Sequence, residues 1–370
     1  MDKEHFPIFL VATPGLENAL CNEAADLGFF EPKPVFGGVE ISGGWRDVWR
    51  ANLELRGAGR VLVRIDSFRA SHLAQLDKRA RAVAWGEVLR KDVPVRVEAS
   101  CRKSKIYHSG AAAERVEKAI AQELGAPIES DAQIRVLVRI ENDLCTISLD
   151  TSGEGLHRRG HKLEVNKAPM RETMAALLLR ECGYTGDEPV LDPMCGSGTL
   201  VIEAAEMALG LKPGRTRPFA FEHLARFDPN EWAAMKQARG GKSTSFLFLG
   251  SDRDAGAIRM SLANAERAGT SSVTRFAQIP IDQLERPEGP AGLVIVNPPY
   301  GARIGDRKKL YPLYGALGQV LKARFSGWRV GMVTTDKALA QATGLAFGKP
   351  GESIDNNGLR ISLYRTDVLA

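Results

Sequence analysis

The second half of the sequence predicts an α/β fold built on a parallel sheet, and the first half predicts an α+β fold. Short apolar segments alternate with segments of helical periodicity in the second half, which is typical of parallel strands joined by crossover helices. Strand-like and helix-like segments are mixed in the first half, where two apolar runs flank Glu141-Asn142-Asp143 as a hairpin. The length of 370 residues indicates two or three domains.

Turn and stop signals separate the expected elements of the first half. Pro14-Gly15 predicts a turn after the first strand, and Gly28 predicts the end of the helix that follows. Strands are expected at residues 8–12, 35–41 (a strand, a turn and a strand), 60–65, 93–100, 134–140 and 144–149. Helices are expected at residues 16–27, 45–55, 73–83 and 111–124.

The second half is expected to begin in the basic stretch between Ser152 and Pro169, and residues 212–245 are interpreted as an insertion after its first helix. A closing hairpin of residues 345–347 and 359–365 is predicted across Asn356-Asn357-Gly358. The other strands are expected at residues 189–191, 246–250, 273–276, 293–296 and 329–334, and the helices at residues 199–209, 255–268 and 310–322.

The composition excludes several classes of protein. With 44% hydrophobic and 26% charged residues, the chain is not mainly disordered, collagen-like or a coiled coil. It contains no run of about 18 apolar residues, so neither a transmembrane helix nor a membrane partner is expected. Its five cysteines form no Cys-x-x-Cys pair, which argues against a disulfide framework and a zinc site. We expect no metal and a reduced, cytoplasmic setting.

Basic residues are concentrated in three short runs. The net charge of +5 is mild, so any basic surface must be local. The runs are residues 102–108, 157–162 and 303–309. One such run is commonly a solvated surface stretch, but three in one chain indicate a polyanion partner. The candidate phosphate contacts are Arg102, Lys103, Lys105, Arg158, Arg159 and Arg303, of which Arg303 has a structural salt bridge as its alternative role.

A glycine-rich turn, Asp192-Pro193-Met194-Cys195-Gly196-Ser197-Gly198-Thr199, lies between a predicted strand and a predicted helix. Ligands of open α/β sheets bind beyond the carboxyl ends of the strands. Gly196 and Gly198 have no Cβ, so a ligand can approach the backbone there. Thr199 is the expected helix N-cap, next to unpaired N–H donors. The turn matches neither a P-loop nor a dinucleotide fingerprint, and a purely structural turn is the alternative.

Asp252 ends the next predicted strand. A carboxylate in this place accepts hydrogen bonds from both hydroxyls of a ribose. The alternative is a cap for the helix at residues 255–268, a role that Asp254 can share. The glycine-rich turn followed by this acid predicts an adenosine-type cofactor. Cys195, within the turn, is interpreted as a small packing residue and not as a nucleophile.

The most specific signal is a buried strand that runs into Asn297-Pro298-Pro299-Tyr300. An aromatic amine is a poor nucleophile because its lone pair is delocalised into the ring. The side-chain oxygen of Asn297 and the carbonyl oxygen of Pro298 can accept its two N–H bonds, which steers the nitrogen towards sp3 geometry. The prolines stiffen the loop, and Tyr300 can stack on a flipped base. The pattern predicts methylation of an exocyclic amine, with a proline-stiffened turn as the alternative.

The chain resembles a known family over nearly its whole length. Its second half is similar to a Class I, Rossmann-like, S-adenosylmethionine-dependent methyltransferase domain with a seven-stranded sheet and a C-terminal antiparallel hairpin. Its first half is similar to a ferredoxin-like segment followed by an RNA-binding THUMP domain. The strongest resemblance is to the bacterial 23S rRNA guanine-N2 methyltransferases, in the form with a single methyltransferase domain. The segments that carry it are residues 13–17, 37–40, 50–53, 104–109, 156–160 and 168–172 and the two motifs above.

The resemblance implies three domains, at residues 1–55, 56–155 and 156–370. It implies that Asn297 to Tyr300 hold the target amine. One departure concerns the cofactor's adenine amine, which commonly faces an acid after the third strand. Here Asp282 is displaced from that place, and Gln278 or a backbone carbonyl is the alternative contact. The implied contacts of S-adenosylmethionine are Asp192, Pro193, Cys195, Gly196, Gly198, Thr199 and Asp252, with Glu172 near the pocket.

Methylation of guanine N2 in 23S rRNA is therefore the expected function, with rRNA as the partner. Three alternatives stay open. A tRNA guanine-N2 methyltransferase has the same domain pairing, and an adenine-N6 methyltransferase acting on DNA or RNA uses the same amine chemistry. A non-catalytic RNA-binding assembly factor is the alternative outside the enzymes. The THUMP-like half favours RNA over DNA, and the sequence indicates neither the target nucleotide nor an oligomeric state.

Overall fold

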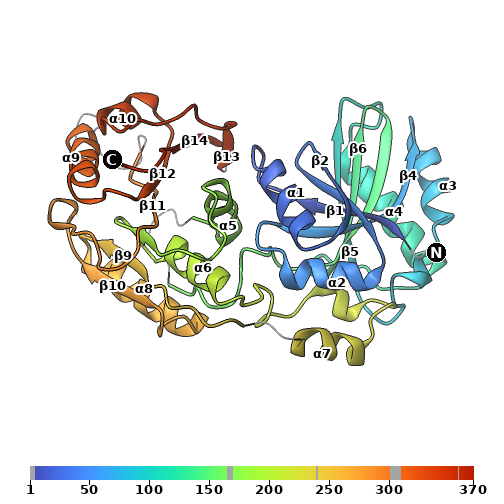
Figure 1. Cartoon of the computed structure of the whole chain (residues 1–370). Coiled ribbons are helices and arrows are strands. Elements are labelled where there is room, and N and C mark those ends of the chain that lie inside the picture. Colours follow the sequence, from blue (N-terminus) through green and yellow to red (C-terminus); the bar gives the residue numbers. More distant parts are fainter. Residues whose placement is uncertain (1–4, 165–169, 239–240, 301–309, 357) are drawn as a thin grey trace. The chain divides into compact units, whose positions relative to one another are not determined.

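The structure is a computed structural model that describes residues 5–164, 170–238, 241–300, 310–356 and 358–370. The chain divides by its internal contacts into two compact units, which are coloured along the sequence in Figure 1. Residues 1–12, 21–156 and 214–238 form the first unit, and residues 13–20, 157–213 and 239–370 form the second. In the parts of the chain described, each unit holds one seven-stranded sheet.

The sheet of the first unit has the strand order β2-β3-β1-β4-β7-β6-β5. Neighbouring strands are antiparallel except β5 and β6, which are parallel, and this mixed pattern confirms the predicted α+β class. Alternate residues of β6 are buried, as the predicted alternation requires. The strands are β1 (Phe6–Val11), β2 (Phe30–Val35), β3 (Gly38–Gly43), β4 (Arg60–Arg69), β5 (Val95–Arg102), β6 (Ile134–Glu141) and β7 (Leu144–Asp150). The helices are α1 (Glu17–Asp26), α2 (Trp45–Glu54), α3 (Leu73–Arg81), the short η1 (Trp85–Glu87) and α4 (Ser109–Glu123).

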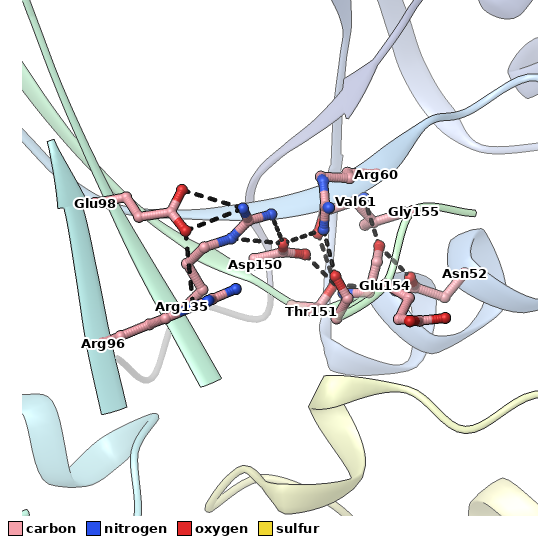
Figure 2. Close-up of polar contacts among 12 residues, drawn as sticks. Asn52, Arg60, Val61, Arg96, Glu98, Arg135, Asp150, Thr151, Glu154 and Gly155 are labelled. Atoms are coloured by element: carbon pink, nitrogen blue, oxygen red, sulfur yellow. Dashed lines mark hydrogen bonds and ion pairs between the residues drawn. The ribbon is translucent and has the colours of Figure 1, made fainter. Parts of the chain in front are cut away.

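A polar network joins three central strands of this sheet around Asp150 (Figure 2). The Asp150 carboxylate is buried at the end of β7 and accepts hydrogen bonds from Arg60 on β4 and Arg135 on β6, each at 2.5 Å. Figure 2 shows the Arg135 guanidinium between Asp150 and Glu98. Because a buried carboxylate needs charged partners, these arginines serve the fold of the first unit.

The expected insertion after the first helix of the second half contributes to the core of the first unit. Its residues 214–238 group with that unit and contain η2 (Ala220–His223) and α7 (Pro229–Gln237). The Phe221 ring stacks on Trp49 of α2 at 6.1 Å between centroids and meets Trp232 of α7 edge-on at 5.0 Å. Residues 214–238 of the insertion therefore pack as part of the first unit.

The sheet of the second unit has the order β10-β9-β8-β11-β12-β14-β13. Its first five strands are parallel. β14 runs antiparallel to β12 and pairs with β13 in the closing antiparallel hairpin, which confirms the Rossmann-like methyltransferase fold class with a C-terminal antiparallel hairpin. Figure 1 shows α8 beside β9 and β10, and α10 beside β12. The strands are β8 (Val190–Asp192), β9 (Phe248–Asp252), β10 (Thr274–Gln278), β11 (Leu293–Val296), β12 (Arg329–Thr334), β13 (Ile354–Asn356) and β14 (Leu359–Arg365). The helices are α5 (Glu172–Glu181), α6 (Thr199–Ala208), α8 (Ala255–Ala268), the short η3 (Ile281–Gln283), α9 (Leu310–Arg324) and α10 (Lys337–Ala342).

The closing hairpin differs from the prediction in its first strand. β14 pairs with β13, whereas residues 345–347 contribute only an isolated bridge from Phe347 to Thr366. The apolar run at 345–347 is explained by burial of Leu345 in the core beside α9 and α10. No helix in the described part of the chain is long and apolar enough to cross a membrane.

Candidate active site

The glycine-rich turn leaves β8 at Asp192 and enters α6 at Thr199. Gly198, with a left-handed φ of +81°, is the helix N-cap, so the prediction that Thr199 caps the helix is wrong. Thr199 is instead the first helical residue. The cap has no side-chain acceptor, which leaves the first N–H groups of α6 without an intrahelical partner at this end.

The two glycines of the turn have different roles. A Cβ on Gly198 would lie 3.0 Å from Ser261 Oγ and 3.2 Å from the Phe276 ring, so this glycine permits close packing of α6, α8 and β10. A Cβ on Gly196 would meet no heavy atom within 4 Å. Gly196 therefore borders open space, and it is the position at which a ligand can approach the backbone.

Two polar residues of α8 form hydrogen bonds with the backbone of the glycine-rich turn. Ser261 donates a hydrogen bond to the Gly196 carbonyl oxygen at 2.9 Å, and Asn264 donates one to the Ser197 carbonyl oxygen at 3.1 Å. Both side chains belong to fully buried residues. The sequence analysis missed them, although two polar residues three apart on the apolar face of a predicted helix were the available signal.

Cys195 packs inside the turn. It is buried, and its Sγ lies 3.8 Å from Ser261 Oγ. Burial is the main cause that raises the pKa of its thiol, and the nearby Asp192 carboxyl adds to the shift. A thiol with a raised pKa is a poor nucleophile, so the geometry favours the packing role.

Asp192 and Asp252 place two carboxyls beside this turn. β9 lies next to β8, and Asp192 pairs in register with Gly250, two residues before Asp252. The pKa of Asp192 is raised to about 8, mainly by burial and to a smaller extent by the charge of Asp252, against the hydrogen bond that Asp192 accepts from the Met194 N–H. Neither carboxyl forms an ion pair with a cation in the described structure. They are suited to a ligand that brings an ammonium group and hydroxyls.

Asp252 also binds the turn directly. Its Oδ2 accepts a hydrogen bond from the Gly196 N–H at 3.1 Å, and its Oδ1 accepts one from the Asp254 N–H at 3.0 Å. The cap of α8 is Asp254, whose Oδ1 accepts from the Gly256 N–H. Asp254, and not Asp252, is therefore the cap of α8. The Asp252 carboxylate is not needed for capping and can serve the predicted ligand.

The Asn297–Tyr300 loop lies at the same edge of the sheet. It follows β11, which pairs in parallel with β8 through Leu293 opposite Val190, so both loops leave the carboxyl ends of neighbouring strands. Asn297 Oδ1 is buried and has no hydrogen-bond partner among the described residues. An unpaired buried acceptor costs about 1–3 kcal/mol, which a bound N–H donor would remove.

The other residues of this loop are tied to the surrounding fold. The Pro299 carbonyl oxygen accepts a hydrogen bond from Tyr314 of α9 at 3.3 Å. The Tyr300 side chain is largely buried and forms a hydrogen bond with the Asn356 side chain. Burial raises the pKa of Tyr300, and that bond opposes the shift, so the phenol is neutral at ordinary pH.

The remaining cofactor candidates also belong to the second unit. Glu172 is the first residue of α5 and is buried, with Lys162 Nζ 3.6 Å from its Oε1. Burial raises the pKa of Glu172, and Lys162 opposes the shift. Gln278 pairs in register with Asp252 and donates to the Arg253 carbonyl oxygen at 3.0 Å, whereas Asp282 lies in η3. Pro193 is buried in the turn.

The predicted phosphate contacts separate into exposed and buried residues. Arg158 is exposed, but Arg159 is buried and its guanidinium lies 3.1 Å from Glu203 of α6. The structure therefore corrects the prediction for Arg159, because a fully enclosed ion pair is not available to RNA. Arg303 lies outside the described residues. The run at 102–108 is mostly exposed, including Arg102, Lys103 and Lys105.

Three models of protein families match the chain. The RMKL-like methyltransferase domain matches residues 159–358, the RlmL ferredoxin-like domain matches residues 7–62 and the THUMP domain matches residues 70–150. Among curated relatives, the "Ribosomal RNA large subunit methyltransferase K/L" of Vibrio campbellii is 35% identical over 344 residues, covering 89% of this chain and 49% of the relative. The protein of the same description from Syntrophotalea carbinolica is 35% identical, covering 97% and 53%. The chain thus spans about half the length of these curated relatives.

Solved structures match over nearly the full length of both chains. A possible methylase from Clostridium difficile 630 is 28% identical with a TM-score of 0.91, covering 99% of each chain. SMU.472, described as a putative methyltransferase complexed with SAH, is 25% identical with a TM-score of 0.89, covering 100% of this chain and 99% of that chain. The chain belongs to the RMKL-like methyltransferase family, whose members use S-adenosylmethionine.

Proposed function

We propose that this chain transfers a methyl group from S-adenosylmethionine to the N2 amine of a guanine in 23S rRNA. The observation that carries the proposal is Asn297 Oδ1, a buried acceptor that is unpartnered among the described residues and lies beside the glycine-rich turn. The curated relatives described as large-subunit rRNA methyltransferases supply the substrate class. The matching THUMP domain in the first unit supports RNA as the partner.

The residues at the sheet edge fit the cofactor. Asp192 is suited to bind the α-ammonium group of the cofactor, and Asp252 is suited to bind the ribose hydroxyls. At Gly196, which has open space beside its Cα, the cofactor can approach the protein backbone closely. Pro193, Cys195, Gly198 and Thr199 shape the turn, and Glu172, at the start of α5, is a further proposed cofactor contact. Gln278, beside Asp252, is the proposed contact for the adenine amine in place of the displaced Asp282. The bound cofactor supplies an electrophilic methyl group.

The Asn297–Tyr300 loop prepares the acceptor amine. Asn297 Oδ1 and the Pro298 carbonyl oxygen accept the two N–H bonds of the flipped base, which directs the nitrogen lone pair towards the methyl group. Pro299 fixes the loop, which Tyr314 also holds through the Pro299 carbonyl oxygen. Tyr300 stacks on the base, a contact worth about 1–3 kcal/mol against a flipping cost of similar size. The proton leaves to solvent once methylation has lowered the pKa of the amine.

The phosphate contacts proposed for this function are Arg102, Lys103, Lys105 and Arg158. Within the run of residues 102–108, Tyr107 is a highly exposed aromatic residue, with 84% of its area accessible, and it lies between Lys105 and His108 in the sequence. An exposed aromatic ring among cations is suited to stacking on an unpaired base.

The test begins with RNA from a strain that lacks the gene. We expect the protein and radiolabelled S-adenosylmethionine to yield N2-methylguanosine in 23S rRNA. Label in tRNA would move the target and keep the mechanism. N6-methyladenosine would favour the adenine alternative, which a solved relative described as a predicted N6-adenine-specific DNA methylase also suggests. Cofactor binding without label in any RNA would support the assembly-factor alternative.

Asn297→Ala tests the role of the unpartnered acceptor. We expect the single-turnover rate to fall by about 100-fold or more, because an oriented acceptor is lost from the transition state, while cofactor affinity is retained. Asn230→Ala, at an exposed position of α7, is the matched control and should change neither quantity. A full methylation rate in Asn297→Ala would contradict the proposed mechanism.

A further inference from the structure

A short loop near the N-terminus belongs to the catalytic unit. Residues 13–20 group with the second unit, although β1 immediately before them lies in the sheet of the first. The loop is closed by two local hydrogen bonds, from the Leu16 N–H to the Thr13 carbonyl oxygen and from the Gly15 N–H to Glu17 Oε2 at 2.7 Å. Nothing in the proposed chemistry yet uses this loop.

The loop lies against β13 by backbone contact. The Pro14 carbonyl oxygen accepts a hydrogen bond from the Asp355 N–H at 3.0 Å. A Cβ on Gly15 would lie 2.4 Å from the Ser353 carbonyl oxygen and 3.0 Å from Ile354 Cα. Gly15 also has a φ of +92°, in the left-handed region that favours glycine. Only glycine therefore allows the two backbones to approach so closely.

β13 in turn holds a residue of the Asn297–Tyr300 loop. Asn356, the last residue of β13, follows Asp355 and forms a side-chain hydrogen bond with Tyr300. The other edge of β13 pairs with β14, with Asp355 opposite Arg360. The strand is thus fixed by β14 on one side and by the Pro14–Gly15 backbone on the other, and its end contacts the tyrosine that faces the target base in the proposed function.

We propose that Gly15 and Asn356 are positioning residues for the target base: the Pro14–Gly15 loop fixes β13 so that Asn356 holds the Tyr300 ring in its stacking orientation. This inference rests on the proposed function for the identity of the base. Neither residue touches the reacting atoms, so both act through Tyr300. The arrangement explains why a loop that follows a strand of the first unit is part of the catalytic unit.

Single-turnover rates of Gly15→Ala and Asn356→Ala test the proposal on the full chain. We expect each rate to fall by about tenfold, the size of one lost hydrogen bond in the transition state, with the affinity for S-adenosylmethionine unchanged within twofold. Gly28→Ala is the matched control, because Gly28 has a similar φ of +72° but no heavy atom within 4 Å of the added Cβ. An equal loss of rate in Gly28→Ala would overturn the proposal.

A double-mutant cycle separates positioning from a general effect on the fold. If Asn356 acts through the Tyr300 hydroxyl, Asn356→Ala should reduce the rate less than twofold further in a Tyr300→Phe background. Fully multiplicative losses would overturn the proposal. Asn356→Ala does not change the Pro14–Gly15 loop. The cycle therefore tests the proposal even if Gly15→Ala reduces the fraction of folded protein.

A measurement that does not depend on methyl transfer distinguishes failure of the positioning proposal from failure of the proposed function. The protein labelled with 3-fluorotyrosine contains six tyrosines, and Tyr300→Phe assigns the Tyr300 resonance in its fluorine spectrum. We expect this resonance to move in Gly15→Ala and Asn356→Ala but not in Gly28→Ala. A moved resonance in a protein that methylates no RNA supports the positioning and overturns the proposed function. An unmoved resonance in an active protein overturns the positioning alone.

Discussion

Two basic runs of similar composition have opposite environments in this molecule. Residues 102–108, at the end of β5, present Lys103, Lys105 and Tyr107 to solvent. Residues 157–162 direct most of their charged groups inwards, where Arg159 and Lys162 lie beside acids of the second unit. The density of cations in a run therefore does not show whether it binds a polyanion or stabilises the fold.

The difference lies in acids that are distant in sequence. Glu203 and Glu206 are three residues apart on α6, both are buried, and they face Arg159 and His161. Near residues 102–108, by contrast, the acids do not enclose the cations: Arg102 Nε lies 4.0 Å from Glu141 Oε1, but the Arg102 side chain remains 66% exposed. The Lys105 N–H donates to Asp143 Oδ1 at 2.7 Å, and Ser104 Oγ accepts from the Asp143 N–H at 3.1 Å. The backbone is fixed while the cations remain exposed.

Arg159→Met gives the largest expected effect. The Arg159 and Glu203 side chains are each 1% exposed, so the variant leaves a buried carboxylate without its guanidinium partner. We expect the free energy of unfolding to fall by about 3–5 kcal/mol, measured by urea denaturation. Lys103→Met, at an exposed position of the other run, should change it by less than about 0.5 kcal/mol.

The double variant Arg159→Met with Glu203→Leu sharpens this contrast. Removing both charges eliminates the desolvation cost of each, so it should recover most of the stability lost in the single variant. If Arg159→Met is as stable as the unmodified protein, or weakens RNA binding without loss of stability, the distinction between the buried and the exposed run does not hold.

Asp192 is a buried carboxyl that, unlike Glu203, has no cationic partner among the described residues. Its pKa, raised by burial to about 8, means that the folded state binds a proton which the unfolded state releases near pH 4. Its contribution to stability is therefore greatest at low pH and is lost as pH rises from about 4 to about 8, with a slope of up to about 1.4 kcal/mol per pH unit.

Asp192→Asn isolates this contribution. Between pH 5 and pH 8 the stability of the variant should fall less steeply than that of the unmodified protein, as measured by urea denaturation at fixed ionic strength. Asp228→Asn, at the exposed N-cap of α7, is the matched comparison, because it makes the same carboxyl-to-amide change outside the site. Parallel pH profiles for Asp192→Asn and the unmodified protein would contradict a raised pKa at this site.

The sequence predicted the elements that local patterns determine. The parallel strands of the second unit, the glycine-rich turn and the Asn297–Tyr300 loop were each recognisable from contiguous residues, and their placement at one sheet edge followed from the rule for α/β sheets. The N-cap was misassigned because Thr199 is a good cap by type, whereas Gly198 adopts the left-handed conformation that ends the turn.

What the sequence did not predict depends on contacts between distant segments. The burial of Arg159 requires Glu203, 44 residues further along the chain. The hairpin strand at β13 was missed because Ile354–Asn356 is short and polar, and its place is set by β14 and by the backbone at Pro14. Ser261 and Asn264 gained their roles only when α8 was placed under the turn.

The smallest expected effect comes from the exposed run itself. Lys103→Ala with Lys105→Ala should leave stability and cofactor affinity unchanged and weaken RNA binding. Each lost phosphate contact should reduce the slope of log affinity against log salt by about 0.7 to 0.9, measured by fluorescence anisotropy on an rRNA fragment. Lys118→Ala is the matched control on the same unit, because Lys118 is exposed but paired with Glu114 at 2.5 Å. An unchanged slope in the double variant would show that residues 102–108 do not contact phosphates. An equal change for each lysine in Lys118→Ala would show that exposure alone does not distinguish a binding run from a structural one.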